Sequence, residues 1–349
     1  MIYKDKSKEL MWWLVAKEGD GILNKEAKDQ WVTGSVLDQW IARLFEQDRR
    51  AAAKLISWVE NDIERAYIMR SILKQTEHRM VIGITGSPGA GKSSLVEALT
   101  RLYRDKNERV GIVAVDPSSP YTGGAILGDR IRMQTHGTDR DVFIRSVGTR
   151  GHLGGVTRST SDVLRILEGG GYERLILETV GVGQSEIEIM QISDTVVVVL
   201  NPGTGDGIQA IKAGIMEVAD IFVINKSDLP GADLMKNDIE MMLNLSCNEK
   251  TWRPPVVLTS VINQTGVETL REKIEAHQSY MLKSGLRDER SKERVRLEVW
   301  RQWENKLRAT FEEVWKAAQE KWVNLEKEDP YEVAEVLWAE LSVAPSNLR

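Results

Sequence analysis

The sequence predicts an α/β fold in which a mostly parallel sheet is flanked by helices and extended at both ends by helical segments. Residues 79–282 alternate short apolar runs with helical patterns, which is typical of strands connected by crossover helices. Residues 1–78 and 283–349 instead place apolar residues at helical spacing, as between Leu37 and Leu44. We therefore expect an N-terminal helical extension (1–78), a central α/β domain (79–282) and a C-terminal helical arm (283–349).

Apolar runs in the central part predict the strands of the sheet. They are short and rich in Val, Ile and Leu, as expected for parallel strands that are buried on both faces. The runs are Met80–Thr85, Val110–Val115, Val142–Ser146, Leu175–Glu178, Thr195–Leu200, Ile221–Asn225 and Val256–Thr259. Ligands of such sheets bind beyond the carboxyl ends of the strands, so functional residues are expected directly after these runs.

Composition excludes several classes of protein. The 47 basic and 52 acidic residues give a net charge of −5, and no basic run stands out, which argues against a nucleic-acid binder. The single cysteine, Cys247, excludes an intramolecular disulfide framework and a multi-cysteine metal site. The longest strongly apolar run, Val196–Leu200, is too short to span a bilayer, and the charged N-terminus does not resemble a secretory signal. A cytoplasmic protein is expected.

A phosphate-binding loop is the most specific motif. Residues 86–93 read G-x-x-x-x-G-K-S, between the first predicted strand and a helical pattern that starts at Ser94. Backbone N–H groups of such a loop surround a phosphate, Lys92 reaches the β- and γ-phosphates, and the Ser93 hydroxyl binds Mg²⁺. The predicted nucleotide-binding residues here are Gly86, Ser87, Pro88, Gly89, Ala90, Gly91, Lys92, Ser93 and Ser94. The chain is thus predicted to have a P-loop NTPase fold.

A second motif indicates that the nucleotide is GTP or GDP. Asn225, Lys226 and Asp228 form N-K-x-D directly after a predicted strand, which is the guanine-reading pattern of P-loop GTPases. The aspartate accepts hydrogen bonds from two guanine donors that adenine lacks, so adenine would leave it unsatisfied. Backbone N–H groups near Thr259, Ser260 and Val261 are expected to contact the guanine carbonyl oxygen.

A third motif, residues 178–181, occupies the place of the D-x-x-G motif of many GTPases. Glu178 is expected to hold Mg²⁺ through water, and the N–H of Gly181 to meet the γ-phosphate. Val182 stands where many GTPases carry a glutamine that orients the attacking water. Slow intrinsic hydrolysis is therefore expected, with help from a partner or another loop.

Two further carboxylates are predicted to complete the Mg²⁺ shell. Asp116 ends a predicted strand beside the phosphate loop, and Asp129 follows a glycine-rich stretch that resembles a mobile switch loop. The alternative for Asp129 is a cap on the helix expected to begin near Arg130.

Four contiguous motifs together resemble the MeaB/MMAA group of GTPases, whose members were once called ArgK or lysine/arginine/ornithine transport ATPases. The motifs are Asp116–Pro120, Gly123–Asp129, Gly151–Val156 and Glu178–Glu186. This group belongs to the metallochaperone branch of the SIMIBI class of P-loop GTPases. One departure is the stretch Arg145–Gly151, where the group usually has a serine- and proline-containing segment.

The resemblance implies a GTP-hydrolysing metallochaperone for a B12-dependent acyl-CoA mutase, methylmalonyl-CoA mutase or a relative. Such proteins gate adenosylcobalamin loading, protection and reactivation of the mutase, which in turn accelerates GTP hydrolysis, and the cobalamin is handled through the mutase. The third switch of the group corresponds to residues 202–212, with Asp206, Gln209 and Lys212 as catalytic couplers beside Lys92. For Lys212 the alternative is a solvated helix lysine.

The resemblance also implies a homodimer held by helical arms. In the C-terminal arm, apolar residues recur at helical spacing, and they either pack on the same chain or form a subunit interface. They are Trp300, Trp303, Leu307, Phe311, Val314 and Trp322.

Other functions considered are a kinase of a transport protein, a nickel-delivery GTPase and a signal-recognition-type GTPase. Nickel delivery calls for a metal-binding cluster, yet the histidines (His78, His136, His152, His277) and Cys247 are scattered. The N-K-x-D motif favours GTP over the ATP of a typical kinase.

Overall fold

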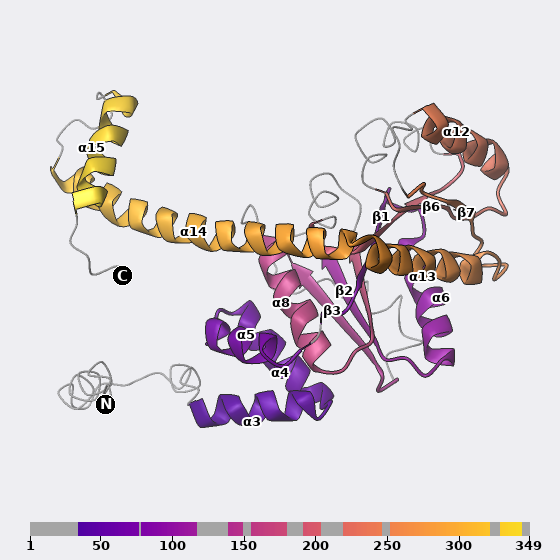
Figure 1. The fold of residues 1–349 in the computed structure, drawn as a ribbon, viewed down its shortest axis with the longest axis horizontal. Coiled ribbons are helices and arrows are strands. Elements are labelled where there is room, and N and C mark those ends of the chain that lie inside the picture. Colours follow the sequence, from indigo (N-terminus) through magenta and orange to yellow (C-terminus); the bar gives the residue numbers. More distant parts are fainter. Residues whose placement is uncertain are drawn as a thin grey trace. The chain divides into compact units, whose positions relative to one another are not determined.

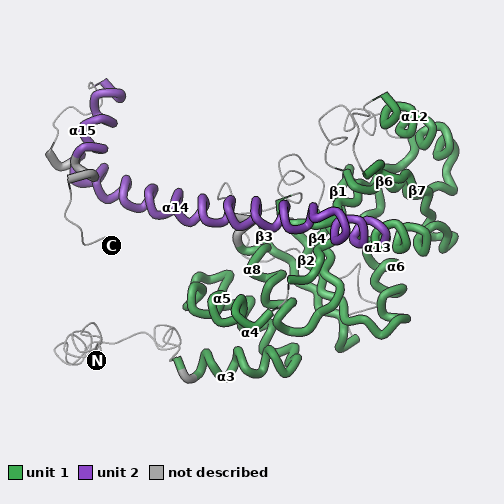
Figure 2. Tube along the Cα trace, viewed as in Figure 1, with its two compact units in different colours: residues 1–275 green, residues 276–349 purple. Residues whose placement is uncertain are grey.

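The computed structural model describes residues 34–76, 78–116, 139–148, 155–179, 191–203, 219–245, 252–321 and 329–343 (Figure 1). The chain divides into two compact units, residues 1–275 and 276–349 (Figure 2).

A seven-stranded sheet forms the centre of the first unit, with strand order β3-β2-β4-β1-β5-β6-β7. Every neighbouring pair of strands is parallel. The strands are β1 (Val81–Gly86), β2 (Val110–Asp116), β3 (Val142–Gly148), β4 (Arg174–Thr179), β5 (Thr195–Leu200), β6 (Ile221–Ile224) and β7 (Val256–Leu258). The predicted parallel α/β fold is confirmed, and each strand lies within two residues of its predicted bounds.

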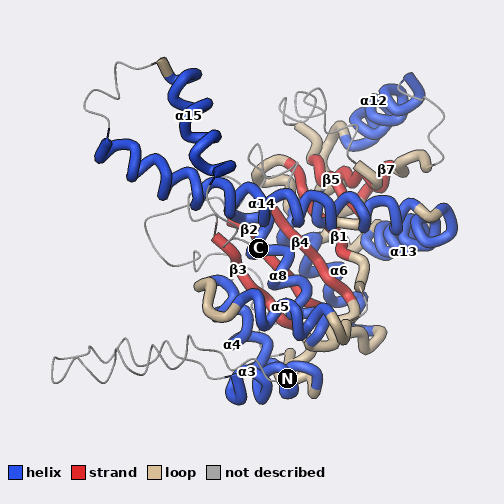
Figure 3. The backbone as a smooth tube through the Cα atoms, turned by 60° about the vertical axis from the view of Figure 1, so that its left-hand side comes forward, coloured by secondary structure: helices blue, strands red, loops and turns tan. Residues whose placement is uncertain are grey.

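Helices cover both faces of this sheet (Figure 3). On one face, α6 (Lys92–Asp105) and the start of α13 (Val267–Ser284) pack against β1, β2 and β5 through residues such as Leu95, Leu99 and Leu270. On the other face lie α8 (Gly155–Gly169) and α12 (Ala232–Leu245). Strands β1, β5 and β6 are buried along their whole length, which explains their unbroken apolar runs.

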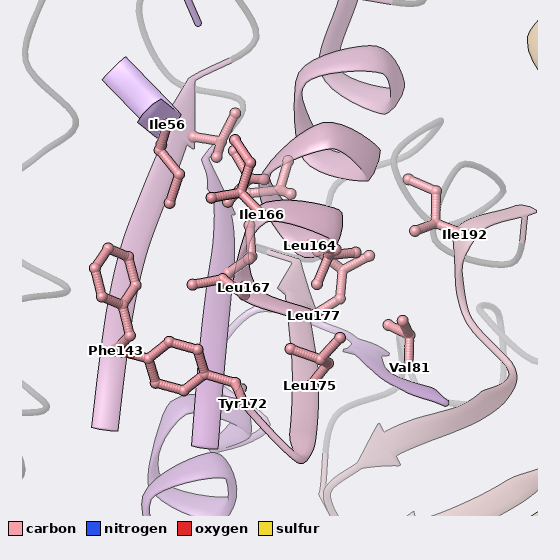
Figure 4. Packing of buried hydrophobic residues seen from close by; sticks show 14 of the residues in the cluster. Ile56, Val81, Phe143, Leu164, Ile166, Leu167, Tyr172, Leu175, Leu177 and Ile192 are labelled. Atoms are coloured by element: carbon pink, nitrogen blue, oxygen red, sulfur yellow. The ribbon is translucent and has the colours of Figure 1, made fainter. Parts of the chain in front are cut away.

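The N-terminal helices α3 (Gly34–Phe45), α4 (Arg49–Glu60) and α5 (Arg65–Leu73) share the α8 side of this core. Figure 4 shows Ile56 of α4 on the same side of the packed cluster as Ile166 and Leu167 of α8.

Ion pairs fasten the same helices to the sheet layer. Arg65 pairs with the buried Asp162 of α8, and Glu60 pairs with Arg145 of β3. Moving α4 or α5 away from the sheet layer would leave a buried charge without its partner, which is costly. These ion pairs therefore favour one position of the two helices.

The second unit contains α14 (Leu286–Lys321) and α15 (Pro330–Val343). Ala318, Val333 and Leu337 form a small core between them, with Val314 and Trp315 packed against it. Other large apolar side chains are exposed, and on α14 these are Val295, Val299, Trp300, Trp303, Leu307 and Phe311. Val314 thus packs on the same chain, whereas Trp300 and Trp303 are exposed. Whether the exposed residues form a subunit interface stays a prediction, and Trp322 lies outside the described residues.

Within the part of the chain that the structure describes, no helix combines the length and the apolar character needed to cross a bilayer.

Candidate functional site

The loop between β1 and α6 contains two glycines, Gly86 and Gly91, at which any other side chain would clash. Gly86 has φ +138°, and a Cβ there would lie 1.9 Å from the carbonyl oxygen of Val199 on β5. Gly91 has φ +88°, and its Cβ would lie 2.3 Å from Nδ2 of Asn225. Glycine at these two positions therefore allows Val199 on β5 and Asn225, which follows β6, to approach the backbone of the loop closely.

Lys92 begins α6 and is 6% exposed. Its Nζ donates to the carbonyl oxygens of Gly86 at 2.8 Å and of Ser87 at 3.0 Å. These loop carbonyls orient the ammonium group and stabilise its charge in a nearly buried position. The lysine is therefore held against the loop that is predicted to surround the phosphates.

Ser93 and Glu178 meet beside this lysine. The Ser93 hydroxyl donates to Oε1 of Glu178 at 2.6 Å, and the glutamate is buried near the carboxyl end of β4. Asp116 ends β2, whose residue Val115 is paired with Thr179 of β4, so the last residues of both strands lie at the same edge of the sheet.

A hydroxyl and a carboxylate in contact are suitable donors for Mg²⁺, which binds few protein oxygens and completes its shell with water and phosphate. No group of three or more His, Cys, Asp or Glu side chains that could hold a metal occurs among the residues described. The contact between the Ser93 hydroxyl and the Glu178 carboxylate is what fits Mg²⁺ bound together with a nucleotide.

Asn225 connects the predicted guanine-binding loop to the phosphate loop. Its Nδ2 donates to the carbonyl oxygen of Ala90 at 2.9 Å, and its Oδ1 accepts from the Thr259 hydroxyl at 3.1 Å. The sequence assigned Asn225 to reading guanine, whereas these contacts direct its amide toward the phosphate loop. For Thr259 the sequence predicted only a backbone role near the base; its side chain is fully buried, and its hydroxyl completes the connection.

Asp228 is held in place by the loop that follows β7. Its Oδ1 accepts from the Ser260 hydroxyl at 2.5 Å, and Ser227 N donates to the carbonyl oxygen of Thr259 at 3.0 Å. The sequence predicted a role only for the backbone near Thr259, Ser260 and Val261, so the contact made by the Ser260 hydroxyl is an addition. In the sequence, only the presence of a serine at position 260 could have suggested this contact.

The described site residues thus gather at the carboxyl edge of the sheet, from Asp116 on β2 to Ser260 after β7. This is the edge at which doubly wound folds bind ligands. Other predicted site residues lie outside the described residues: Asp129, Gly181, Asp206, Gln209 and Lys212.

Comparison with known proteins agrees with this geometry. Residues 52–316 match the family model of the methylmalonyl Co-A mutase-associated GTPase MeaB. A putative GTPase of Pyrococcus abyssi is 47% identical over 268 residues, which cover 76% of this chain and 83% of the relative. The mouse mitochondrial methylmalonic aciduria type A homolog is 33% identical over 300 residues, covering 80% of this chain and 70% of the relative.

Among solved structures, a LAO/AO transport system kinase superposes with a TM-score of 0.68 at 25% identity, covering 89% of this chain and 99% of that one. The family match extends over most of the chain, and it includes both the phosphate loop and the guanine-reading motif. The resemblance seen in the sequence is confirmed: the chain belongs to the MeaB family of P-loop GTPases.

Proposed function

We propose that this protein binds GTP with Mg²⁺ at the carboxyl edge of the sheet and hydrolyses it slowly. The observation that carries the proposal is the direct connection between the phosphate loop and the guanine-reading loop, through Ala90, Asn225 and Thr259. A nucleotide with its phosphates at Lys92 and its base at Asp228 would span these two loops. Family membership supports guanine nucleotide binding independently.

The residues divide into two groups by chemistry. Lys92 and the loop N–H groups would stabilise negative charge on the phosphates, and the Gly181 N–H would meet the γ-phosphate. Ser93 and Glu178 would hold Mg²⁺, with Asp116 and Asp129 joining the shell. Bound Mg²⁺ would neutralise part of the charge on the phosphate oxygens during transfer.

Slow intrinsic turnover follows from the residue at position 182. Valine has no polar group with which to orient the attacking water. A partner could compensate for valine by moving Gln209 or Lys212 toward the γ-phosphate, because a lysine or a glutamine delivered on a loop can stabilise the charge that develops during phosphoryl transfer.

The partner proposed is a B12-dependent acyl-CoA mutase. The proposal is supported by the name of the family and by the name of the mouse relative. In this role, the GTPase would gate loading of adenosylcobalamin, protect the mutase during turnover and assist its reactivation, without binding cobalamin itself. A cytoplasmic location remains a prediction.

Steady-state GTP hydrolysis with a panel of purified acyl-CoA mutases tests this proposal. We expect a low basal rate that one mutase raises by about tenfold or more, because one added charge or hydrogen bond in the transition state has at least that effect. A cobalamin-dependent enzyme that is not an acyl-CoA mutase serves as the control. Basal hydrolysis that no mutase changes would retain the GTPase and remove the mutase from the proposal.

We also propose that α14 forms a homodimer interface. Five of its exposed apolar residues, Val295, Val299, Trp303, Leu307 and Phe311, recur every four positions, and Trp300 lies beside Val299. Two of the six are tryptophans, a residue type enriched in interfaces. A second copy of the chain would bury this surface.

Sedimentation of the Trp303→Glu variant tests the dimer. Trp303 is 62% exposed, so the substitution disturbs little within one chain but places a charge in the proposed interface. We expect the variant to be a monomer at concentrations where the wild type is a dimer, whereas Gln302→Glu, which adds the same charge one position away, remains dimeric. A Trp303→Glu variant that is still fully dimeric would place the interface elsewhere.

A further inference from the structure

Two buried threonines lie directly beneath the phosphate loop. Thr85 precedes Gly86 in β1, and Thr179 follows Glu178 at the end of β4. The Thr179 hydroxyl donates to the Thr85 hydroxyl at 3.1 Å. Thr85 is 2% exposed and Thr179 is 1% exposed, so water does not compete for this bond.

The threonines face away from the nucleotide. Ile84 is paired with Glu178 in the register of β1 and β4, and successive side chains of a strand point to opposite faces. Glu178 contacts Ser93 of α6, so Thr179 points to the α8 side, as do Leu175 and Leu177. Figure 4 shows these two leucines among the α8 residues Leu164 and Leu167.

Packing alone does not explain hydroxyl groups at these positions. The rest of the α8-facing surface of β4 is aliphatic, and valine would match the shape of threonine without a polar group that needs a partner. Within strands β1 and β4, the only hydroxyl side chains are those of Thr85 and Thr179, at the ends that reach the site. They connect the residue before Gly86, whose carbonyl orients Lys92, to the residue after Glu178.

The ends of β1 and β4 are therefore joined on both faces of the sheet. On the α6 side, Ser93 contacts Glu178; on the α8 side, Thr179 contacts Thr85. The contact between Ser93 and Glu178 uses oxygens that would bind Mg²⁺, whereas the contact between Thr179 and Thr85 uses none of them. The threonine pair can thus keep Glu178 in register with the phosphate loop whether or not the metal is present.

We propose that Thr85 and Thr179 are positioning residues, whose mutual hydrogen bond places the Glu178 carboxylate for Mg²⁺ and so sets the Mg²⁺ dependence of nucleotide binding. The inference rests on the proposed binding of guanine nucleotide with Mg²⁺. It requires neither hydrolysis nor a mutase.

Titration of fluorescent GDP binding with Mg²⁺ tests this role in four variants: Thr179→Val, Thr85→Val, the double valine variant and Thr100→Val. Thr100 is the matched control, because it is also fully buried but its hydroxyl bonds only to the carbonyl oxygen of Val96 within α6. The free energy of unfolding is measured in parallel by chemical denaturation.

We expect Thr179→Val to raise the Mg²⁺ concentration for half-maximal tight binding by about tenfold, the effect of losing one buried hydrogen bond. Thr85→Val should do the same. In the double variant stability should recover toward the wild type, because neither hydroxyl is left without a partner, while the Mg²⁺ midpoint stays raised. Thr100→Val should leave the midpoint unchanged.

Wild-type Mg²⁺ midpoints in Thr179→Val and in the double variant would overturn the positioning role, even if both variants are less stable. A midpoint that recovers together with stability in the double variant would also overturn it, because the pair would then act on folding alone. Wild-type protein that binds GDP without any Mg²⁺ dependence would contradict the proposed function itself, and this inference with it.

Discussion

Replacing Lys92 with alanine is expected to abolish measurable GTP hydrolysis and to weaken GTP binding sharply. The ammonium group is held by two carbonyl oxygens of the phosphate loop, and in this position it would meet the β- and γ-phosphates. Loss of one preorganised charge at a developing negative centre lowers turnover by about 100- to 1,000-fold. Single-turnover phosphate release from bound GTP measures the effect on chemistry separately from binding.

Lys106→Ala is the matched control for this experiment. Lys106 lies just beyond the other end of the same helix and its side chain is 45% exposed, so its loss should leave both rate and affinity near those of the wild type. If Lys92→Ala hydrolyses GTP at the wild-type rate, the phosphate site lies elsewhere in the chain.

Asp228→Asn is expected to exchange guanine for xanthine preference. The carboxylate would accept from the two guanine donors N1–H and N2–H₂, and an amide cannot accept from both. Xanthine carries an oxygen in place of the N2 amine, which can accept from the amide. We expect GDP affinity to fall by about 100-fold or more and xanthosine diphosphate affinity to rise, because a polar group that the bound base covers and leaves without a partner discriminates strongly.

Competition between the two diphosphates for the same site measures this exchange. The amide oxygen of asparagine can still accept from the Ser260 hydroxyl, so the loop should keep its conformation. Asp233→Asn, at the exposed start of α12, makes the same chemical change away from the site and should have no effect. An unchanged preference for guanine in Asp228→Asn would mean that another group reads the base.

Most of the fold could be predicted because parallel strands buried on both faces leave a strong signal. The runs at β1, β5 and β6 are rich in valine and isoleucine and contain no charged residue, and each strand is wholly buried. The order of the strands left no such signal. The place of β4 between β1 and β2 depends on tertiary packing that no local pattern records.

The site was predictable in its motifs and less so in its contacts. The glycines and Lys92 of the phosphate loop have a fixed spacing, which the chemistry of phosphate binding demands. The contacts of Asn225 with Ala90, and of Thr179 with Thr85, join residues that are far apart in the sequence. Threonine at the end of a strand is common for local reasons, so its type alone did not indicate a role.

The same limit applies to the N-terminal helices. Their apolar spacing predicted helices correctly, but not that Arg65 and Glu60 would pair with residues of α8 and β3. An ion pair depends on the fold that brings its members together.

Phosphate release by the wild-type protein from GTP and from ATP, each with and without Mg²⁺, tests the central proposal most directly. We expect slow release from GTP that requires Mg²⁺, and no measurable release from ATP, because adenine offers Asp228 no pair of hydrogen-bond donors. Equal rates with the two nucleotides, or release that is unaffected by removing Mg²⁺, would contradict it.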